Sequence, residues 1–371
     1  MPAAKALAEV DHFEPVKPSK EPIDFVKLRT LDFSKYNDGP EARKELASIV
    51  RDAMTTKGFF TLINHGISEE EITRQVDIGH TILKRTPPEE KLRLKAQILE
   101  KGSYPGFKLR GLWNVGSDAK DRIENFNVYR VMSQNEQPRA LEPYRHEIQD
   151  FIDFIHKDIL KKLLTLFALA LELADEDYFV NAHSYEGHDE SWLRYMEYEA
   201  HHDDRDSGGK TLWLNGHKDF PALSLLFSQP MTTLQVRDEH DEDSWKYVAH
   251  TPGAIIVNAG EIMSWWTGDY FKAAIHRVVE PPRDQMGHDR SSVFYFTVPN
   301  DDVVINTLLD QSPVLREAGV AMAYAPEDAP TSKQWCNARV KLTGQSKQAA
   351  NGKTGTVVEK VIGNVTTAWF K

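Results

Sequence analysis

The segment His217-Lys218-Asp219 constrains the fold of this chain more than any other part of the sequence. It lies in the run 211–227, which is rich in large apolar residues and favours an extended conformation. Side chains two apart in a strand point to the same face, so His217 and Asp219 would point together while Lys218 points away. Pro221 then ends or bends the strand pairing. The pattern predicts a strand that presents an imidazole and a carboxylate side by side.

A second histidine, His276, lies in another predicted strand. Ile275, Val278 and Val279 favour β structure around it, and a proline pair beginning at Pro281 stops the segment. Together the two strands supply two imidazoles and one carboxylate.

The next run, 289–298, is strongly β in composition. Its period of two places Arg290, Ser292, Phe294 and Phe296 on one face. A guanidinium beside a hydroxyl is well suited to bind a carboxylate, because the planar fork donates two parallel hydrogen bonds.

His217, Asp219 and His276 form a candidate metal site. Two histidines and one carboxylate on one side of a metal leave its other side open, which suits non-haem Fe(II) that binds a cosubstrate and O2 together. A lone His-x-Asp is more often a surface pair or a structural hydrogen bond, but its combination with a distal histidine and Arg290-x-Ser292 is far less common by chance. The same three ligands could hold zinc for hydrolysis, although a zinc hydrolase has no use for Arg290 on that face.

The composition limits the classes of partner. The chain has 371 residues, 40% hydrophobic and 27% charged, with a net charge of −11. That charge argues against nonspecific nucleic-acid binding. No apolar run reaches the length of a membrane span, and the N-terminus lacks the apolar core of a secretory signal. The single Cys336 excludes an internal disulfide and fits a reducing compartment, so we expect a cytoplasmic protein. We expect its partner to be a small-molecule substrate.

Periodicity gives the remaining elements. Residues 1–20 are expected to be loosely ordered. Two features invite a functional interpretation but favour a structural one: His201-His202-Asp203-Asp204 is typical of a solvated acidic loop, and Trp265-Trp266 of core packing. The pattern predicts helices over 40–57, 68–83, from 87 onward and 138–176, a strand over 59–64, a loop over 102–118, and mostly strands over 190–300.

Three further motifs carry a family resemblance. Residues 57–67 (Lys-Gly-Phe-Phe-Thr-Leu-Ile-Asn-His-Gly-Ile), 23–25 (Ile-Asp-Phe) and 257–261 (Val-Asn-Ala-Gly-Glu) resemble signatures of the isopenicillin N synthase-like, 2-oxoglutarate-dependent Fe(II) dioxygenases. The resemblance covers roughly residues 20–345.

The resemblance implies a β-rich α+β fold. Its core would be a distorted double-stranded β-helix, or jelly-roll, with a long backing helix and N-terminal helices. We expect a single dioxygenase domain over 21–345, with an N-terminal part over about 21–185, a catalytic core over about 186–300, and a C-terminal extension over 346–371. The alternative is an α+β protein with a separate helical N-terminal domain.

The resemblance also implies roles for the site residues. His217, Asp219 and His276 match the iron ligands, and Arg290 and Ser292 match the pair that binds the distal carboxylate of 2-oxoglutarate. The other 2-oxoglutarate contact is expected from Tyr198. O2 is the second cosubstrate, and ascorbate is a possible reductant. Met196, Glu199 and Glu261 depart from the residues usual in relatives, outside the ligand set.

The substrate is expected to be small and rather apolar. The candidate contacts are aromatic and aliphatic, and Tyr104–Trp113 is a candidate lid. The sequence is similar to fungal dioxygenases that tailor secondary metabolites, which implies hydroxylation, desaturation or oxidative ring formation at a C–H bond. A rival within the family oxidises its substrate without 2-oxoglutarate. The predicted substrate contacts are Phe126, Val128, Met196, Phe294 and Phe296.

Overall fold

The computed structural model describes residues 7–115, 119–200, 212–238, 241, 244–342, 357–362 and 365–369. The stretch His201–Asp204, for which the sequence predicts an acidic loop, lies outside these ranges.

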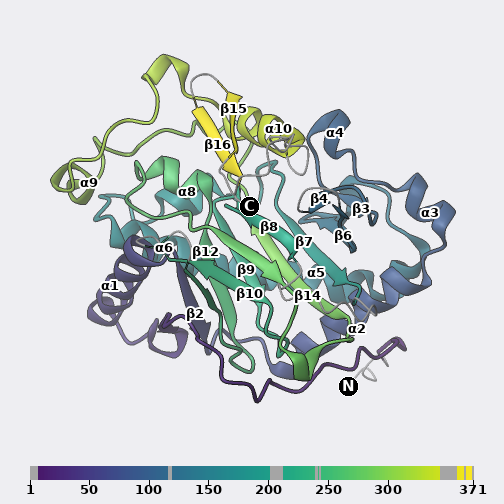
Figure 1. The fold of residues 1–371 in the computed structure, drawn as a ribbon. Coiled ribbons are helices and arrows are strands. Elements are labelled where there is room, and N and C mark those ends of the chain that lie inside the picture. Colours follow the sequence, from purple (N-terminus) through teal and green to yellow (C-terminus); the bar gives the residue numbers. More distant parts are fainter. Residues whose placement is uncertain are drawn as a thin grey trace, which may run out of the picture.

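Two β-sheets form the centre of the molecule (Figure 1). The larger has eight strands in the order β1-β2-β12-β9-β14-β7-β6-β3, and the smaller has four in the order β11-β10-β13-β8. This architecture confirms the predicted jelly-roll core. The larger sheet contains β1 (Arg29–Asp32), β2 (Phe59–Ile63), β3 (Gly106–Lys108), β6 (Ile123–Tyr129), β7 (Trp192–Tyr198), β9 (Leu223–Phe227), β12 (Ile255–Ala259) and β14 (Arg290–Thr297). The smaller contains β8 (Leu212–His217), β10 (Leu234–Arg237), β11 (Trp245–Tyr247) and β13 (His276–Val279).

A nearly continuous helical run backs the larger sheet, as the pattern over 138–176 predicts. It comprises η3 (Arg139–Tyr144), α5 (Arg145–Phe154), the π-helical segment η4 (Ile155–Leu160) and α6 (Lys161–Ala170). The run is shorter than predicted, because the chain turns at Glu172, which has a left-handed backbone with φ of 53°. His156 Nδ1 lies 2.8 Å from the Tyr295 hydroxyl, which places the run against the outer face of β14.

Helix α2 (Glu69–Arg85) covers the same outer face. It begins with a capping box, in which the Ser68 side chain accepts from Glu71 N and the Glu71 carboxylate accepts from Ser68 N. Gly79 permits close packing, because a Cβ there would lie 2.5 Å from the Tyr195 ring of β7. With helices on this outer face, the inner face of the larger sheet turns toward the smaller sheet.

The remaining elements are short or peripheral. None of the helices in the described part of the chain is both long enough and apolar enough to cross a bilayer. Trp266 is fully buried and packs on Phe179 with ring centroids 5.1 Å apart, as expected of a core residue. The other helices are α1 (Pro40–Thr56), α3 (Pro88–Arg93), α4 (Ile98–Lys101), α7 (Tyr178–Ala182), α8 (Glu261–Trp266), α9 (Pro313–Glu317), α10 (Ser332–Leu342), η1 (Phe33–Lys35), η2 (Met132–Gln134), η5 (Arg283–Gln285) and η6 (Pro326–Asp328), and two hairpins comprise β4 (Asn114–Val115) with β5 (Ala119–Lys120) and β15 (Val357–Ile362) with β16 (Val365–Trp369).

Two expectations need correction. The predicted loop 102–118 contains β3, which extends the larger sheet by pairing with β6, and β4. The N-terminal segment was expected to be loosely ordered over 1–20, yet residues 8–13 make specific contacts with α2 and residues 17–20 with η5 (Figure 1). Asp11 pairs with Arg85 at 2.7 Å, and the His12 ring lies 3.0 Å from Asp77. These polar partners lie far along the chain, so composition alone did not reveal them.

The N-terminal helices and the sheets share one hydrophobic core. A single cluster of buried apolar side chains includes Val50 of α1, Ile78 of α2, Leu163 of α6 and Val257 of β12. The apolar core is therefore continuous from the N-terminal helices to the sheets.

Candidate metal and cosubstrate site

The three predicted metal ligands converge between the two sheets. One ligand atom from each of His217, Asp219 and His276 lies within 4.8 Å of the others. Asp219 Oδ1 is 3.6 Å from His217 Nε2 and 3.8 Å from His276 Nε2. Among the described residues, this is the one cluster of histidine, cysteine and carboxylate side chains with metal-binding geometry.

Strand pairing brings the two histidines together. His217 ends β8, His276 begins β13, and the two residues are direct cross-strand partners. Each Nδ1 faces a backbone carbonyl, that of Asn215 at 2.9 Å or that of Ala274 at 3.2 Å. A proton on Nδ1 therefore donates to the backbone and leaves the Nε2 lone pair available to a metal.

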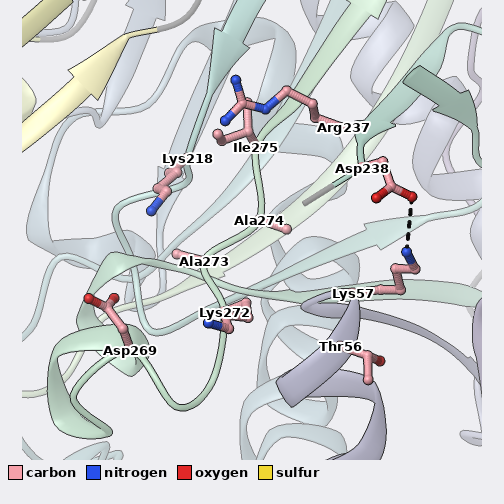
Figure 2. A pocket seen from close by; sticks show the side chains of 10 residues that line it. All are labelled: Thr56, Lys57, Lys218, Arg237, Asp238, Asp269, Lys272, Ala273, Ala274 and Ile275. Carbon is pink, nitrogen blue, oxygen red and sulfur yellow. Dashed lines mark hydrogen bonds and ion pairs between the residues drawn. The ribbon is translucent and has the colours of Figure 1, made fainter. Parts of the chain in front are cut away.

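Lys218 points away from the ligands, as the alternation predicts. It lines a separate hollow of about 310 Å³, whose walls include Arg237 and Lys272 (Figure 2). On its rim Lys57 donates to Asp238 at 3.3 Å. This hollow and the one that contains the ligands have no described lining residue in common.

Asp219 is held by two side chains that the sequence analysis did not identify. Its Oδ2 accepts from Ser224 Oγ at 2.7 Å and from Asn258 Nδ2 at 3.0 Å, so Oδ1 is the oxygen turned toward the histidines. Asn258 lies in the 257–261 motif, but only its pairing with Ser224 across β12 and β9 shows its role. Gly260 allows the Asp219 turn to pack closely, because a Cβ there would lie 2.9 Å from Asp219 O and 2.0 Å from Pro221 O.

The protonation states of these residues suit metal binding. Burial alone would raise the pKa of Asp219, but the charges of His276 and His217 and the bond from Asn258 hold it well below its ordinary value. Burial lowers the pKa of His276 to about 4. At neutral pH the site therefore offers an ionised carboxylate and a neutral imidazole, the forms that coordinate a metal.

Arg290 and Ser292 lie on the inner face of β14 with unused hydrogen-bonding capacity. Arg290 is 1% exposed, and neither its Nε nor its Nη1 has a hydrogen-bond partner in the described structure. The buried Ser292 hydroxyl also has none there. Tyr198 is the cross-strand partner of Arg290, and its ring centroid lies 4.9 Å from the guanidinium carbon. Buried donors without partners are costly, so this cradle fits a bound carboxylate.

The ligands, Arg290 and Tyr198 border one hollow, here called the inter-sheet pocket, whereas Ser292 is not among its lining residues. It is lined by the three ligands, by Arg290 and Tyr198, and by the predicted contacts Met196, Phe294 and Phe296. Its other lining residues are Phe59, Arg194, Leu214, Ser224, Leu226, Leu234, Ile256, Asn258 and Val278.

Phe126 and Val128 are not in this pocket, contrary to prediction. They pair with Tyr195 and Leu193 of β7, on the opposite face from Met196. The Tyr195 hydroxyl donates to Gln75 of α2 at 2.6 Å, which identifies that face as the one under the helices. The residues of β6 that share the inner face are instead Asn125 and Asn127.

The candidate lid segment borders the site through Tyr104. Its ring stacks on Phe220, the residue after Asp219, with centroids 5.8 Å apart. It also lies 5.0 Å from the guanidinium carbon of Arg194, a buried pocket residue that the sequence analysis did not single out.

Family models match both halves of the chain. The 2OG-Fe(II) oxygenase superfamily matches residues 187–299, and the N-terminal model of non-haem dioxygenase in morphine synthesis matches residues 28–148. The first match spans all three ligands and the cradle, and the second contains the 57–67 motif.

Curated relatives agree with these models. The 2-oxoglutarate-dependent dioxygenase ecdK of Aspergillus rugulosus is 27% identical over 329 residues, covering 81% of this chain and 97% of the relative. The 2-oxoglutarate-Fe(II) type oxidoreductase hxnY of Emericella nidulans is 28% identical over 313 residues, covering 80% and 85%.

Solved structures share the fold. A full-length protein of Neurospora crassa, crystallised in complex with alpha-KG, has a TM-score of 0.70 and 21% identity, covering 88% of this chain and 99% of that one. JOX2 in complex with 2OG, Fe and JA has a TM-score of 0.62 and 19% identity, covering 86% and 87%. Family models match both halves of the chain, and the curated relatives are similar over most of their length. The solved structures have the same fold. This chain belongs to the 2-oxoglutarate- and Fe(II)-dependent oxygenase superfamily.

Proposed function

We propose that this protein uses 2-oxoglutarate and O2 to oxidise a C–H bond of a small organic molecule by hydroxylation, desaturation or oxidative ring formation. The observation that carries the proposal is the position of the His217, Asp219 and His276 cluster. It shares one buried pocket with Arg290, whose Nε and Nη1 have no partner among the described residues.

The donor set suits Fe(II). Two imidazoles and a carboxylate on one side of the metal leave positions open for a chelating cosubstrate and O2. Bound iron would supply the oxidising chemistry, with 2-oxoglutarate converted to succinate and CO2. The chain itself orients Asp219 through Ser224 and Asn258 and excludes bulk water by packing the ligands between two sheets.

The cradle suits the far carboxylate of 2-oxoglutarate. Arg290 can donate from two nitrogens in one plane, and the Ser292 hydroxyl, two residues further on the same strand face, adds a third donor. Tyr198 covers the guanidinium from the neighbouring strand. Burial lowers the pKa of Arg290 while Tyr198 acts in the opposite direction, so a bound anion would relieve an unfavourable buried charge.

The pocket wall beyond the cradle includes a large apolar part. Met196, Phe294 and Phe296 supply a flexible thioether and two stacked rings 5.6 Å apart, which favours a substrate with a substantial apolar body. The fungal relatives include enzymes named as 2-oxoglutarate-dependent oxidoreductases, and we assign this chain to secondary-metabolite tailoring on that likeness. We place it in the cytoplasm, since its one cysteine is buried and has no second cysteine to pair with.

An anaerobic titration tests the cofactor assignment. Fe(II) added to the protein, followed by 2-oxoglutarate, should give a weak visible charge-transfer band as the keto acid chelates iron. His276→Ala should abolish the band, and Lys218→Ala is the matched control, because Lys218 lies between two ligands in sequence but lines the other hollow. Failure of the wild type to bind Fe(II) would refute the proposal.

Product analysis separates the rivals. Succinate released during O2-dependent turnover supports our assignment. Bound iron with turnover but no succinate would identify an oxidase that works without 2-oxoglutarate. Turnover under strict anaerobiosis would instead indicate hydrolysis on zinc.

A further inference from the structure

Arg194 is a second buried arginine without a carboxylate partner. It is 6% exposed, and among the described residues no carboxylate lies within ion-pair distance of it. Two other buried arginines show the usual solution: Arg130 and Arg339 each pair with a carboxylate, at 3.0 and 2.6 Å. Within the described part of the chain, Arg290 is the other buried arginine without a carboxylate partner. The proposed function already gives Arg290 an anion to bind, the far carboxylate of 2-oxoglutarate. Both of these arginines line the inter-sheet pocket.

The Arg194 guanidinium is fixed in place from one side. It lies on β7, and its Nε donates to Asn127 Oδ1 at 2.7 Å across the β6–β7 pair. Its Nη2 is buried and has no hydrogen-bond partner in the described structure. A guanidinium that is held at one nitrogen, has another nitrogen unused and belongs to a residue lining a pocket is preorganised to bind a ligand.

Asn125 supplies a second unused donor beside it. Two contacts fix the orientation of the Asn127 amide. Its Oδ1 accepts from Arg194, which can only donate, and its Nδ2 donates to Tyr104 O at 2.8 Å. Asn127 Nδ2 also donates to Asn125 Oδ1 at 3.0 Å. Asn125 Nδ2 is therefore the free end, and it is buried without a partner among the described residues. Two orphaned donors thus occur together on the inner face of β6 and β7.

Aromatic rings surround the guanidinium. Its carbon lies 4.9 Å from the Phe296 centroid, 5.0 Å from that of Tyr104 and 5.6 Å from that of Trp192. These rings stabilise the cation through their faces, but they leave its buried Nη2 without a hydrogen-bond partner among the described residues. They also exclude water, which strengthens any ionic contact made there.

We propose that Arg194 binds a carboxylate of the organic substrate, so that the substrate is a small organic acid with an apolar body. This inference rests on the proposed function and narrows its substrate class. Asn125 adds a hydrogen bond to the same carboxylate. Phe296 and Tyr104 pack on the adjoining apolar part of the molecule.

The location separates this subsite from the 2-oxoglutarate cradle. Arg194 lies opposite Phe294, whereas Arg290 lies opposite Tyr198, four positions along the strand, or roughly 13 Å. Arg194 is nearer the metal end: Phe296, which its guanidinium faces, is the cross-strand partner of Ser224, and Ser224 holds Asp219. A substrate anchored at Arg194 therefore lies beside the metal ligands.

Paired neutral and acidic probes test the inference without knowledge of the natural substrate. Calorimetry would measure binding of phenylacetate and of phenylacetamide to the metal-free protein and to the protein loaded with Fe(II) and 2-oxoglutarate under anaerobic conditions. The wild type should bind the acid about 10- to 100-fold more tightly than the amide, since a charged hydrogen bond replaces a neutral one. Arg194→Gln should remove this preference, and Arg194→Lys should retain part of it because the charge remains.

The controls distinguish the possible failures. Arg74→Gln removes an arginine that pairs with Glu147 outside the pocket, and should keep the acid preference. Equal binding of acid and amide by the wild type, or no saturable acid binding, would overturn the inference. Loss of the iron–2-oxoglutarate band in Arg194→Gln with the acid preference intact would assign Arg194 to the cosubstrate instead. Absence of that band in the wild type refutes the proposed function alone, because the comparison of wild type with Arg194→Gln in the metal-free protein still reports on Arg194.

Discussion

His217 and His276 are direct cross-strand partners on β8 and β13, with ring centroids 4.4 Å apart. The register of one antiparallel pair therefore sets the geometry of two of the three metal ligands. Asp219 completes the set from the turn after β8, where Ser224 and Asn258 fix its orientation.

Removing the bonds to Asp219 should weaken metal binding more than it weakens the fold. Ser224→Ala and Asn258→Ala each leave Asp219 Oδ2 with one partner instead of two. Loss of such an outer contact typically costs about 10- to 100-fold in metal affinity. Anaerobic Fe(II) titration of each variant gives the value. Ser228→Ala is the matched control, because its hydroxyl bonds His250 away from the ligands, and an equal loss there would contradict the assignment.

Gly260→Ala should displace the turn that carries Asp219. The added Cβ would meet Pro221 O at 2.0 Å, and neither backbone can move freely. We expect both weaker Fe(II) binding and a lower free energy of unfolding, by about 2–4 kcal/mol. Gly287→Ala is the informative comparison: its Cβ has open space but its φ is +76°, so it should cost only about 1 kcal/mol and leave Fe(II) binding intact.

Arg290→Lys should separate cosubstrate binding from metal binding. Lysine keeps the charge but loses the planar pair of donors, so the dissociation constant for 2-oxoglutarate should rise about 10- to 100-fold. Ser292→Ala should have a smaller effect, because it removes one neutral hydroxyl. The iron–2-oxoglutarate band gives both constants. Fe(II) affinity measured without 2-oxoglutarate should match the wild type, and a large change in it would argue against a cradle role.

Two buried histidines should make the fold sensitive to acid. Burial lowers the pKa of both His156 and His183 to about 4, from an ordinary value near 6.5. Between these values the unfolded chain binds more protons than the folded chain, so stability is full above pH 6.5 and falls as the pH drops toward 4. Each histidine should contribute about 2 kcal/mol of loss between pH 7 and pH 5.

Urea unfolding of the metal-free protein at a series of pH values measures this loss. His156→Gln should lower stability at pH 7, because it removes the contacts to Tyr295 and to His183 O, yet it should flatten the pH dependence. An unchanged pH slope in that variant would contradict the assignment of His156 as a titrating group.

The sequence by itself determined the chemistry of the metal site. Residues two apart in a strand share a face whatever the strand packs against, so the outward position of Lys218 and the shared face of Arg290 and Ser292 follow from local periodicity. The residue types then indicate which ligands they suit. The start of α2 is equally local, because the Ser68 side chain caps the helix by accepting from Glu71 N three residues on.

Only the tertiary structure decided which face of each strand points inward. Periodicity groups Phe126 with Val128 but does not say whether they or Asn125 and Asn127 face the pocket. That choice depends on the register of β6 against β7 and on the helices that cover the other face. Arg194 is also a matter of tertiary structure: its significance lies in a buried Nη2 that has no hydrogen-bond partner among the described residues, and a missing partner in space leaves no local signal in the sequence.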